Sequence, residues 1–307
     1  MPNGKDQLQF QVSAPGCSLV LAAHGSVTTP CANKPLYDLA ARAEASGIFS
    51  NVTPAFLYGD PQISNVLDRL PSGGDVVVVP VMTSEGYYSQ RVFPKKLAEN
   101  KSLKQHRVFI STALGMHQKV PGMVAHRIEK MLGLLPAEPN EFTVVFVGHG
   151  TTRHPKSGRA TMELAAAVQG RLSPQADQRP AIRVAFLDQP PTASVAAAKV
   201  KTPHTLIVPY LVSRGPHATV DVPQAFGLPN GPAIEYPLVE TFHDEVSGTE
   251  RLCICDTPVG MYAGMSELVL ELATDQMMSG KPVNLSGLVP VEDDEELIAA
   301  DNKKVNQ

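Results

Sequence analysis

Apolar residues along the chain gather in short continuous runs that recur. Runs such as LVLAA (19–23) and VVFVG (144–148) contain no polar alternation. Strands that are buried on both faces of a parallel sheet show this pattern, because neither face meets water. Stretches such as PLYDLAARAEAS (35–46) and RATMELAAAVQGRL (159–172) separate these runs and are helical in pattern. The pattern therefore predicts βαβ units and mostly parallel sheets.

The two halves of the chain are copies of one unit. Between Pro80 and Pro94 the first copy aligns without a gap on Pro209 to Pro223, at a constant offset of 129 positions. Identities in this stretch include Ser84 with Ser213 and Gly86 with Gly215. The matched stretches are 19–26 with 144–151, 51–64 with 183–194, 76–94 with 205–223, and 107–116 with 251–261.

The repeat predicts two α/β lobes, each a mostly parallel sheet flanked by helices. Each copy ends in a predicted helix, at 121–132 and 265–277, and Pro136 and Pro139 break the first of these. Extra residues near 239–250 indicate an insertion in the second copy. The predicted parts are an N-terminal lobe at 1–138, a C-terminal lobe at 139–280 and a polar, poorly ordered tail at 281–307.

Composition excludes only a few classes of function. The 307-residue chain is 43% hydrophobic and 18% charged, which is typical of a soluble globular protein. A net charge of −4 gives no global basic field for nucleic acid. No apolar run approaches the ~20 residues needed to cross a bilayer, and the first ten residues lack the apolar core of a signal peptide. We therefore expect a cytoplasmic protein without nucleic-acid or membrane partners.

Four cysteines are too few and too scattered for a disulfide framework: Cys17, Cys31, Cys253 and Cys255. Cys253 and Cys255 share one face of a strand in LCIC, so both sulfurs can face one metal ion. Two ligands do not complete a zinc or iron–sulfur site. We favour buried strand cysteines and leave a metal or redox role open.

Candidate ligands stand where strands end. Ligands bind beyond the carboxyl ends of strands in open parallel sheets. In the second copy His149, Asp188 and His217 follow three such strands, and two imidazoles plus a carboxylate form a partial metal shell with open positions. The matching positions in the first copy hold His24, Tyr58 and Tyr88. We interpret this as a duplicated metal site that is retained in the second copy and degraded in the first.

The chain resembles, in two copies over about residues 18–278, the sirohydrochlorin chelatases, which are class II tetrapyrrole chelatases. The motifs that carry the resemblance are GHGT (148–151), AFLD (185–188) and GPHATVDVP (215–223). It implies a ligand cleft between the lobes and a lyase that inserts cobalt, iron or nickel into a tetrapyrrole without a nucleotide cofactor. The metal ion would then be a substrate, with no tightly bound cofactor, in sirohaem or cobalamin-type biosynthesis. By position, His149 and His217 match the paired histidines of the family, and Asp188 its acidic partner, usually glutamate.

The same resemblance implies a substrate with many carboxylates. Arg153 and Arg159 at a helix start, and Arg214 beside His217, are candidates to bind them. Thr151 keeps the hydroxyl of a commoner serine, and His24 is a candidate to touch the macrocycle. Either histidine of the pair can also accept a pyrrole proton. The alternative for the basic residues is a solvated helix start.

Two other functions compete with this interpretation. A non-catalytic tetrapyrrole or metal carrier would explain the degraded first copy, but the complete second copy counts against it. A histidine phosphatase would need an arginine before the histidine, where Gly148 stands. The sequence leaves open which metal is inserted, which tetrapyrrole accepts it, and the oligomeric state.

Overall fold

The computed structural model describes residues 14–27, 30–151, 158–172, 178–243 and 250–286, and it contains one sheet in each lobe. The first sheet has the order β2-β1-β3-β4 and all its pairs are parallel. The second has the order β6-β5-β7-β9-β8, and only β8 runs antiparallel to its neighbour. The strands are β1 Ala14–Gly25, β2 Phe49–Tyr58, β3 Asp75–Pro80, β4 Arg107–Ile110, β5 Phe142–Gly148, β6 Ala181–Phe186, β7 His204–Tyr210, β8 Leu238–His243 and β9 Glu250–Cys255.

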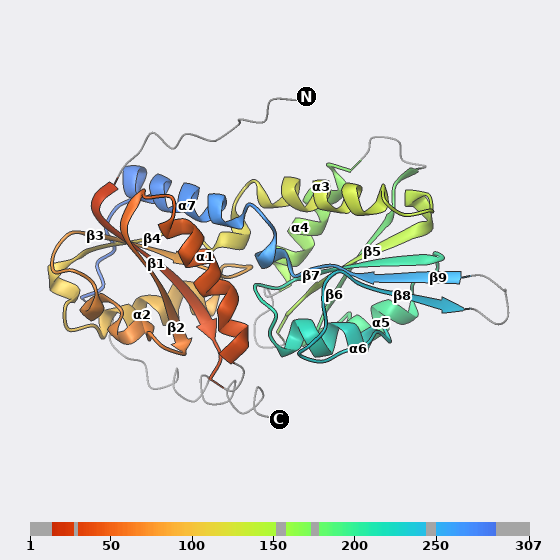
Figure 1. Ribbon diagram of the computed structural model, residues 1–307, viewed down its shortest axis with the longest axis horizontal. Coiled ribbons are helices and arrows are strands. Elements are labelled where there is room, and N and C mark those ends of the chain that lie inside the picture. The colour runs from red at the N-terminus through yellow and green to blue at the C-terminus, as the bar shows by residue number, and fades with distance from the viewer. Residues whose placement is uncertain (1–13, 28–29, 152–157, 173–177, 244–249, 287–307) are drawn as a thin grey trace.

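The helices lie close to the predicted positions and cover the sheets (Figure 1). They are α1 Lys34–Glu44, α2 Phe93–Ala98, α3 Val120–Leu132, α4 Arg159–Gln169, α5 Ala193–Ala198, α6 Val222–Ala225 and α7 Met265–Ser279. A π-helical turn precedes α2 at Tyr88–Val92, and another precedes α6 at His217–Asp221. The predicted α/β fold of two duplicated lobes is therefore confirmed.

Both faces of the central strands are buried, which explains their continuous apolar runs. In β1, Leu19 and Leu21 face a hydrophobic cluster that extends through both lobes, and Val20 faces a cluster within the first lobe. In β5, Val144 joins the shared cluster and Val145 a cluster within the second lobe. Successive side chains of a strand point to opposite faces, so a strand with no polar position must be covered on both sides.

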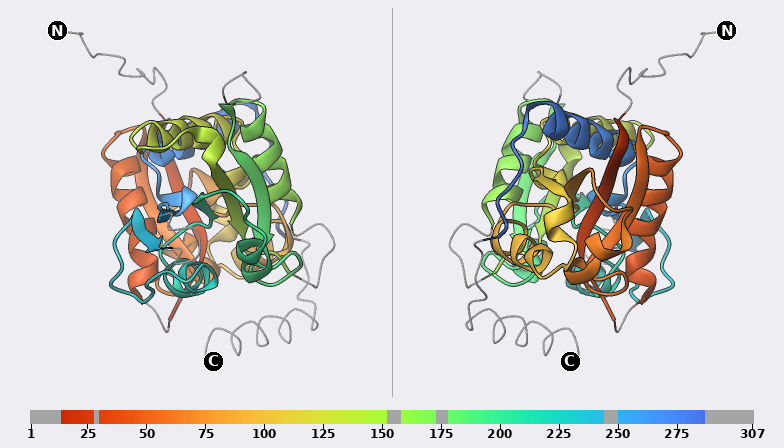
Figure 2. Two further views of the ribbon diagram at one scale, coloured as in Figure 1. Left: turned by 90° about the vertical axis from the view of Figure 1, so that its right-hand side faces the viewer. Right: turned by 90° about the vertical axis from the view of Figure 1, so that its left-hand side faces the viewer.

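The last helix of each copy packs on the other copy. Helix α7 contacts α1, β3 and β4 of the first lobe, and α3 contacts α4 of the second. Both helices run along the same side of the molecule (Figures 1 and 2). The boundary at 138/139 thus separates the two sheets but not the helices that cover them, and this exchange makes one continuous core out of two copies.

A buried ion pair fixes α3 to the second lobe. Arg127 of α3 donates from Nη2 to Oδ1 of Asp256 at 2.6 Å and from Nε to Oδ2 at 3.1 Å. Asp256 is fully buried, and the hydroxyl of Tyr262 donates to it at 2.7 Å. The pair with Asp256 raises the pKa of Arg127, and burial raises the pKa of Tyr262.

The two lobes meet at a joint where residues at the carboxyl end of the second sheet contact loops at the carboxyl end of the first. Hydrogen bonds hold the two ends together there. Tyr210 ends β7, and its hydroxyl donates to the carbonyls of Thr83 at 2.6 Å and Gly115 at 3.0 Å in the first lobe. A Cβ atom built on Gly215 would lie 3.9 Å from the Cβ of Ala32. Loops that follow β1, β3 and β7 therefore meet at the joint.

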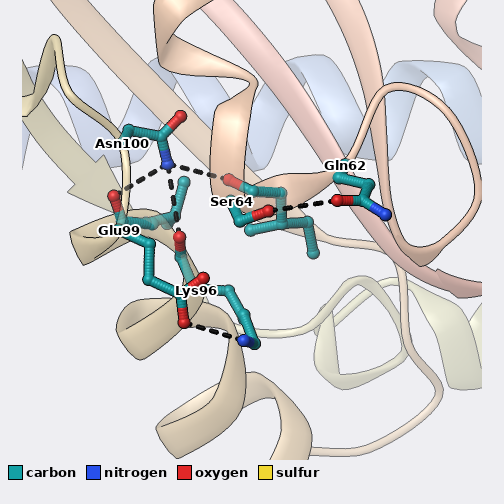
Figure 3. Close-up of polar contacts among 7 residues, drawn as sticks. Gln62, Ser64, Lys96, Glu99 and Asn100 are labelled. Atoms are coloured by element: carbon teal, nitrogen blue, oxygen red, sulfur yellow. Dashed lines mark hydrogen bonds and ion pairs between the residues drawn. The ribbon is translucent and has the colours of Figure 1, made fainter. Parts of the chain in front are cut away.

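A buried asparagine organises the end of α2 in the first lobe (Figure 3). The Nδ2 atom of Asn100 donates to the carbonyls of Ile63 at 2.9 Å and Leu97 at 2.8 Å, and its Oδ1 accepts the Leu67 amide at 2.8 Å. Asn100 satisfies buried backbone groups that strand or helix pairing does not reach.

The structure refines two predictions about the second copy. The inserted residues contribute β8, which pairs antiparallel with β9 at the edge of the sheet. The tail was expected to be poorly ordered from 281, but the amide of Val283 donates to the Val108 carbonyl at 2.8 Å and Leu285 is buried in the first lobe. Residues 281–286 therefore contact the first lobe, where Leu285 joins an apolar cluster. The remainder of the tail, 287–307, lies outside the described residues.

The cysteines of β9 are buried thiols, as the strand pattern predicted. Cys253 and Cys255 both lie in the core of the second lobe. Burial raises the pKa of Cys253 to about 12 and that of Cys255 further. Thiols that stay protonated are poor nucleophiles and poor metal ligands. Among the described helices, none is both long and apolar enough to cross a bilayer.

The ion pair at the joint predicts a large loss of stability in Arg127→Met. The substitution leaves the Asp256 carboxylate buried without its cation, which costs about 3–5 kcal/mol. Urea unfolding should show this loss, and Asp256→Asn should restore part of it in the double variant. Arg107→Met is the control, because Arg107 pairs with Asp75 while 70% exposed, and such pairs contribute under about 1 kcal/mol. Equal effects of the two Met variants would contradict the assignment.

The joint also predicts acid sensitivity through His117. Burial lowers the pKa of His117, because desolvation outweighs the attraction of Glu271, whose Oε2 lies 3.4 Å from Nε2. On acidification the unfolded chain therefore binds this proton first, near pH 6.5. The free energy of unfolding should fall as the pH drops below that value, until the folded histidine also titrates. His117→Gln should reduce the difference in urea midpoint between pH 7.5 and pH 5.5. The exposed His126→Gln should leave it unchanged, and a difference that survives in His117→Gln would assign the sensitivity elsewhere.

Candidate metal and macrocycle site

His149 follows β5 between two glycines that the packing requires. A Cβ on Gly148 would lie 2.2 Å from Oγ1 of Thr161, so only glycine lets α4 approach the strand. Gly150 has a φ of +68°, and a Cβ there would lie 2.7 Å from Cγ of Gln189 and 2.9 Å from Cβ of Phe186. The chain therefore turns sharply after the strand and leaves the imidazole 48% exposed.

Each imidazole of the second copy is held through its Nδ1 atom. Nδ1 of His149 donates to the Gly150 carbonyl at 2.8 Å. His217 begins the π-helical turn, and its Nδ1 donates to Oδ2 of Asp221, the last residue of the same turn, at 2.5 Å. A neutral imidazole that donates from Nδ1 has a lone pair on Nε2. Both rings therefore present Nε2 as a ligand atom.

The two Nε2 atoms face each other at 3.1 Å, with the rings nearly perpendicular at 86°. Two lone pairs at this distance repel unless a proton or a cation lies beside both. Two imidazole nitrogens that bind one ion at about 2.1 Å and at a right angle lie about 3.0 Å apart. The pair thus has the spacing of neighbouring ligands of one transition-metal ion.

Asp188 lies on the other side of His149. Its Oδ2 is 3.8 Å from Nδ1, and its backbone amide donates to the His149 carbonyl at 3.0 Å. Within the described part of the chain, no three His, Cys, Asp or Glu side chains converge as a metal shell. The structure therefore brings Asp188 to the site beside Nδ1 rather than beside the Nε2 pair, and its direct ligation remains a prediction.

The first copy has an equivalent histidine, His24, but tyrosines at the other two positions of the site. Nδ1 of His24 donates to the Gly25 carbonyl at 3.0 Å, as His149 does to Gly150. The His24 ring lies 4.8 Å from the Tyr58 ring and 5.2 Å from the Tyr88 ring, measured between centroids. An aromatic cluster thus occupies the place of the acid and the second imidazole.

The remaining predicted site residues have the following positions. The amide of Thr151 donates to Oε1 of Gln189 at 3.0 Å. Arg159 is exposed at the start of α4 and pairs with Glu163 at 2.6 Å. Arg214 donates to the Ile234 carbonyl and lies 5.5 Å above the Tyr236 ring. Arg153 lies outside the described residues. Substrate binding by these residues remains a prediction.

Sequence reasoning missed two residues that shape the site, Asp221 and Gln189. Asp221 stands four positions after His217, which brings the two side chains together on a helical turn. The spacing is visible in GPHATVDVP (215–223). Gln189 follows Asp188 and fixes the loop after His149 through Thr151. No sequence pattern predicts this contact, because Gln189 and the loop after His149 belong to different βα units.

The family comparison matches both copies. The CbiX family model matches residues 18–131 and 143–276. A probable sirohydrochlorin cobaltochelatase from Halobacterium salinarum is 27% identical over 227 residues, which cover 67% of this chain and 75% of that protein. The resemblance stated from the motifs is therefore confirmed, and the two matched stretches coincide with the predicted repeat.

Solved structures share the fold. CbiX, described as the terminal enzyme for biosynthesis of siroheme in denitrifying bacteria, has a TM-score of 0.60 at 16% identity, over 84% of this chain and 97% of its own. The sirohydrochlorin chelatase SirB from Bacillus subtilis subspecies spizizenii, in complex with cobalt, gives 0.60 at 15% identity, over 85% and 94%. A multi-domain protein from Deinococcus radiodurans with structural similarity to chelatases gives 0.61 at 23% identity over 94% of this chain. The present chain spans 60% of that protein's length.

The packing around His149 predicts that Gly150→Ala destabilises the protein. The left-handed conformation costs a residue with a Cβ about 1–2 kcal/mol, and the contacts with Gln189 and Phe186 add to this. Urea unfolding measures the change. Gly122→Ala in α3 is the control, because a Cβ there meets nothing within 4 Å, so it should be neutral or slightly stabilising. A Gly150→Ala protein as stable as wild type would show that the turn tolerates a side chain.

Proposed function

Because the chain belongs to the CbiX family, we propose that it inserts a divalent metal ion, cobalt or iron, into sirohydrochlorin or a related tetrapyrrole without a nucleotide cofactor. The observation that carries this proposal is the pair of Nε2 atoms of His149 and His217, 3.1 Å apart at the carboxyl ends of β5 and β7. Nitrogen ligands of this kind suit Co²⁺, Fe²⁺ and Ni²⁺. The metal ion is a substrate, so the protein must hold it and then release it.

An incomplete shell suits that task. Two imidazoles leave the remaining coordination positions of the ion to water or to the incoming pyrrole nitrogens. His149 and His217 have side chains 48% and 40% exposed, so a large ligand can reach them. Insertion also releases two pyrrole protons; an imidazole that has lost its metal ion can accept one of them, and the other passes to solvent water, which reaches these half-exposed side chains. A closed four-ligand site would hold the ion too firmly for transfer.

The first lobe supplies a surface for the macrocycle in this proposal. The rings of His24, Tyr58 and Tyr88 stand at the carboxyl end of the first sheet, which meets the second sheet at the joint. Aromatic rings bind flat conjugated ligands through stacked or edge contacts. Among the described residues, Arg159 and Arg214 are the arginines proposed to bind the substrate carboxylates. The lobe that lost its metal ligands would thus serve to hold the ring.

Anaerobic incubation of the protein with sirohydrochlorin and Co²⁺ or Fe²⁺ tests the proposal, with absorbance as the readout. Metal insertion should be faster than in the protein-free control. His149→Ala and His217→Ala should each lose activity by more than about 100-fold, since removing a ligand exceeds the 10–100-fold effect of losing a ligand's partner. His24→Ala should lose less than about tenfold, because its copy offers no second imidazole.

Circular dichroism must show each variant folded, since loss of a packed histidine can unfold a protein. A wild-type protein that binds sirohydrochlorin but accelerates no metal insertion would support the carrier alternative. Loss of turnover in His24→Ala with retention in His217→Ala would move the active centre to the first lobe.

A further inference from the structure

We propose that Asp221 is a positioning residue that holds the His217 imidazole with Nε2 toward the metal ion. The inference rests on the proposed function in taking the His149–His217 pair as the metal site. It assigns a role to a carboxylate that neither the candidate ligand set nor the predicted substrate contacts include.

The geometry of the turn carries the first part of the argument. The hydrogen bond from Nδ1 of His217 to Oδ2 of Asp221 spans one π-helical turn at 2.5 Å. A histidine side chain rotates about two bonds, and this contact fixes the ring and its tautomer. The same ring places Nε2 at 3.1 Å from Nε2 of His149. Without an acceptor at Nδ1, the proton can move to Nε2 and block the ligand atom.

The first copy of the unit supplies an internal comparison. Its turn at Tyr88–Val92 has the same π-helical form, with Tyr88 in place of His217 and Val92 in place of Asp221. Equivalent backbone contacts start the two turns, from Gln90 to Gly86 at 2.9 Å and from Thr219 to Gly215 at 3.0 Å. The backbone therefore forms without the carboxylate.

The residues at the end of the two turns also differ in burial. Val92 is 2% exposed and packs into the first lobe, whereas the Asp221 side chain is 46% exposed. An exposed carboxylate on a turn that folds without it contributes little to stability. Asp221 occurs in the copy that has an imidazole to orient and is replaced by an apolar residue in the copy that has none. This pairing ties the carboxylate to His217 rather than to the fold.

Titration of the macrocycle-free protein with Co²⁺, followed by visible absorption, tests the assignment. Asp221→Val, which copies the residue of the first lobe, should weaken Co²⁺ binding by about 10–100-fold, as loss of a ligand's orienting partner does. Asp221→Asn should bind Co²⁺ more tightly than Asp221→Val, because its amide oxygen still accepts from Nδ1. Asp38→Val is the matched control: Asp38 is 48% exposed in an i,i+4 pair with Lys34 on α1, and its loss should leave Co²⁺ affinity unchanged.

Two results would overturn the proposal. One is Co²⁺ binding by Asp221→Val that equals wild type, and the other is an Asp221→Asn protein as impaired as Asp221→Val. Nitrogen NMR of labelled histidines provides a second measurement that does not require Asp221→Val to fold. In wild type the singly protonated His217 ring should carry its proton on Nδ1, which faces Asp221, and a proton on Nε2 would equally reject the assignment.

The outcomes separate this inference from the proposed function. A protein whose Co²⁺ affinity depends on Asp221 but which metallates no tetrapyrrole would retain the positioning role and lose the chelatase proposal. A protein that metallates sirohydrochlorin, and binds Co²⁺ equally well with Val at 221, would do the reverse.

Discussion

The requirement that both faces of each sheet be covered governs this structure. A parallel sheet of apolar strands cannot leave a face in water, and the last helix of each copy packs on the other lobe. Helix α7 packs on the first lobe and α3 on the second, so one hydrophobic cluster extends through both. Burial of apolar surface provides the main free energy of this arrangement. The Arg127–Asp256 pair then fixes its geometry, because a buried carboxylate tolerates few positions of its cation.

The shared core fixes the position of the strand ends. Tyr210, at the end of β7, donates to carbonyls of the first lobe, and the loops after β1 and β7 meet at the joint. Of the candidate ligands, His149 directly follows β5, and His217 begins the π-helical turn that comes after β7. Short turns with glycine at Gly148 and Gly150 hold the imidazole of His149 close to its strand. A site built this way has little freedom, which suits two ligand atoms whose separation must match one metal ion.

The two copies share backbone features of the site but differ in their side chains. Gly25 and Gly150 have φ values of +74° and +68°, and both copies form a π-helical turn at the same place. The first turn has a tyrosine and a valine where the second has an imidazole and a carboxylate. Sterics and main-chain hydrogen bonding require the positive-φ glycine and the π-helical turn in each copy. In the proposed function a metal ion needs the imidazole and the carboxylate in one copy only, and the first copy has aromatic rings at the matching positions.

The sequence alone determined the class of fold, the repeat and the family. Continuous apolar runs and the fixed offset between copies depend on local spacing, and so does the placement of His149 and His217 at strand ends. Tertiary structure alone decided the exchange of α3 and α7, because an apolar helix face in the sequence does not specify which sheet it will cover. It also decided that Leu285 returns to the first lobe. Finally, it decided that Asp188 lies beside Nδ1 while Asp221 supports His217. Residue spacing shows which side chains share a strand end or a turn, whereas the distance between two particular atoms depends on how separate elements pack.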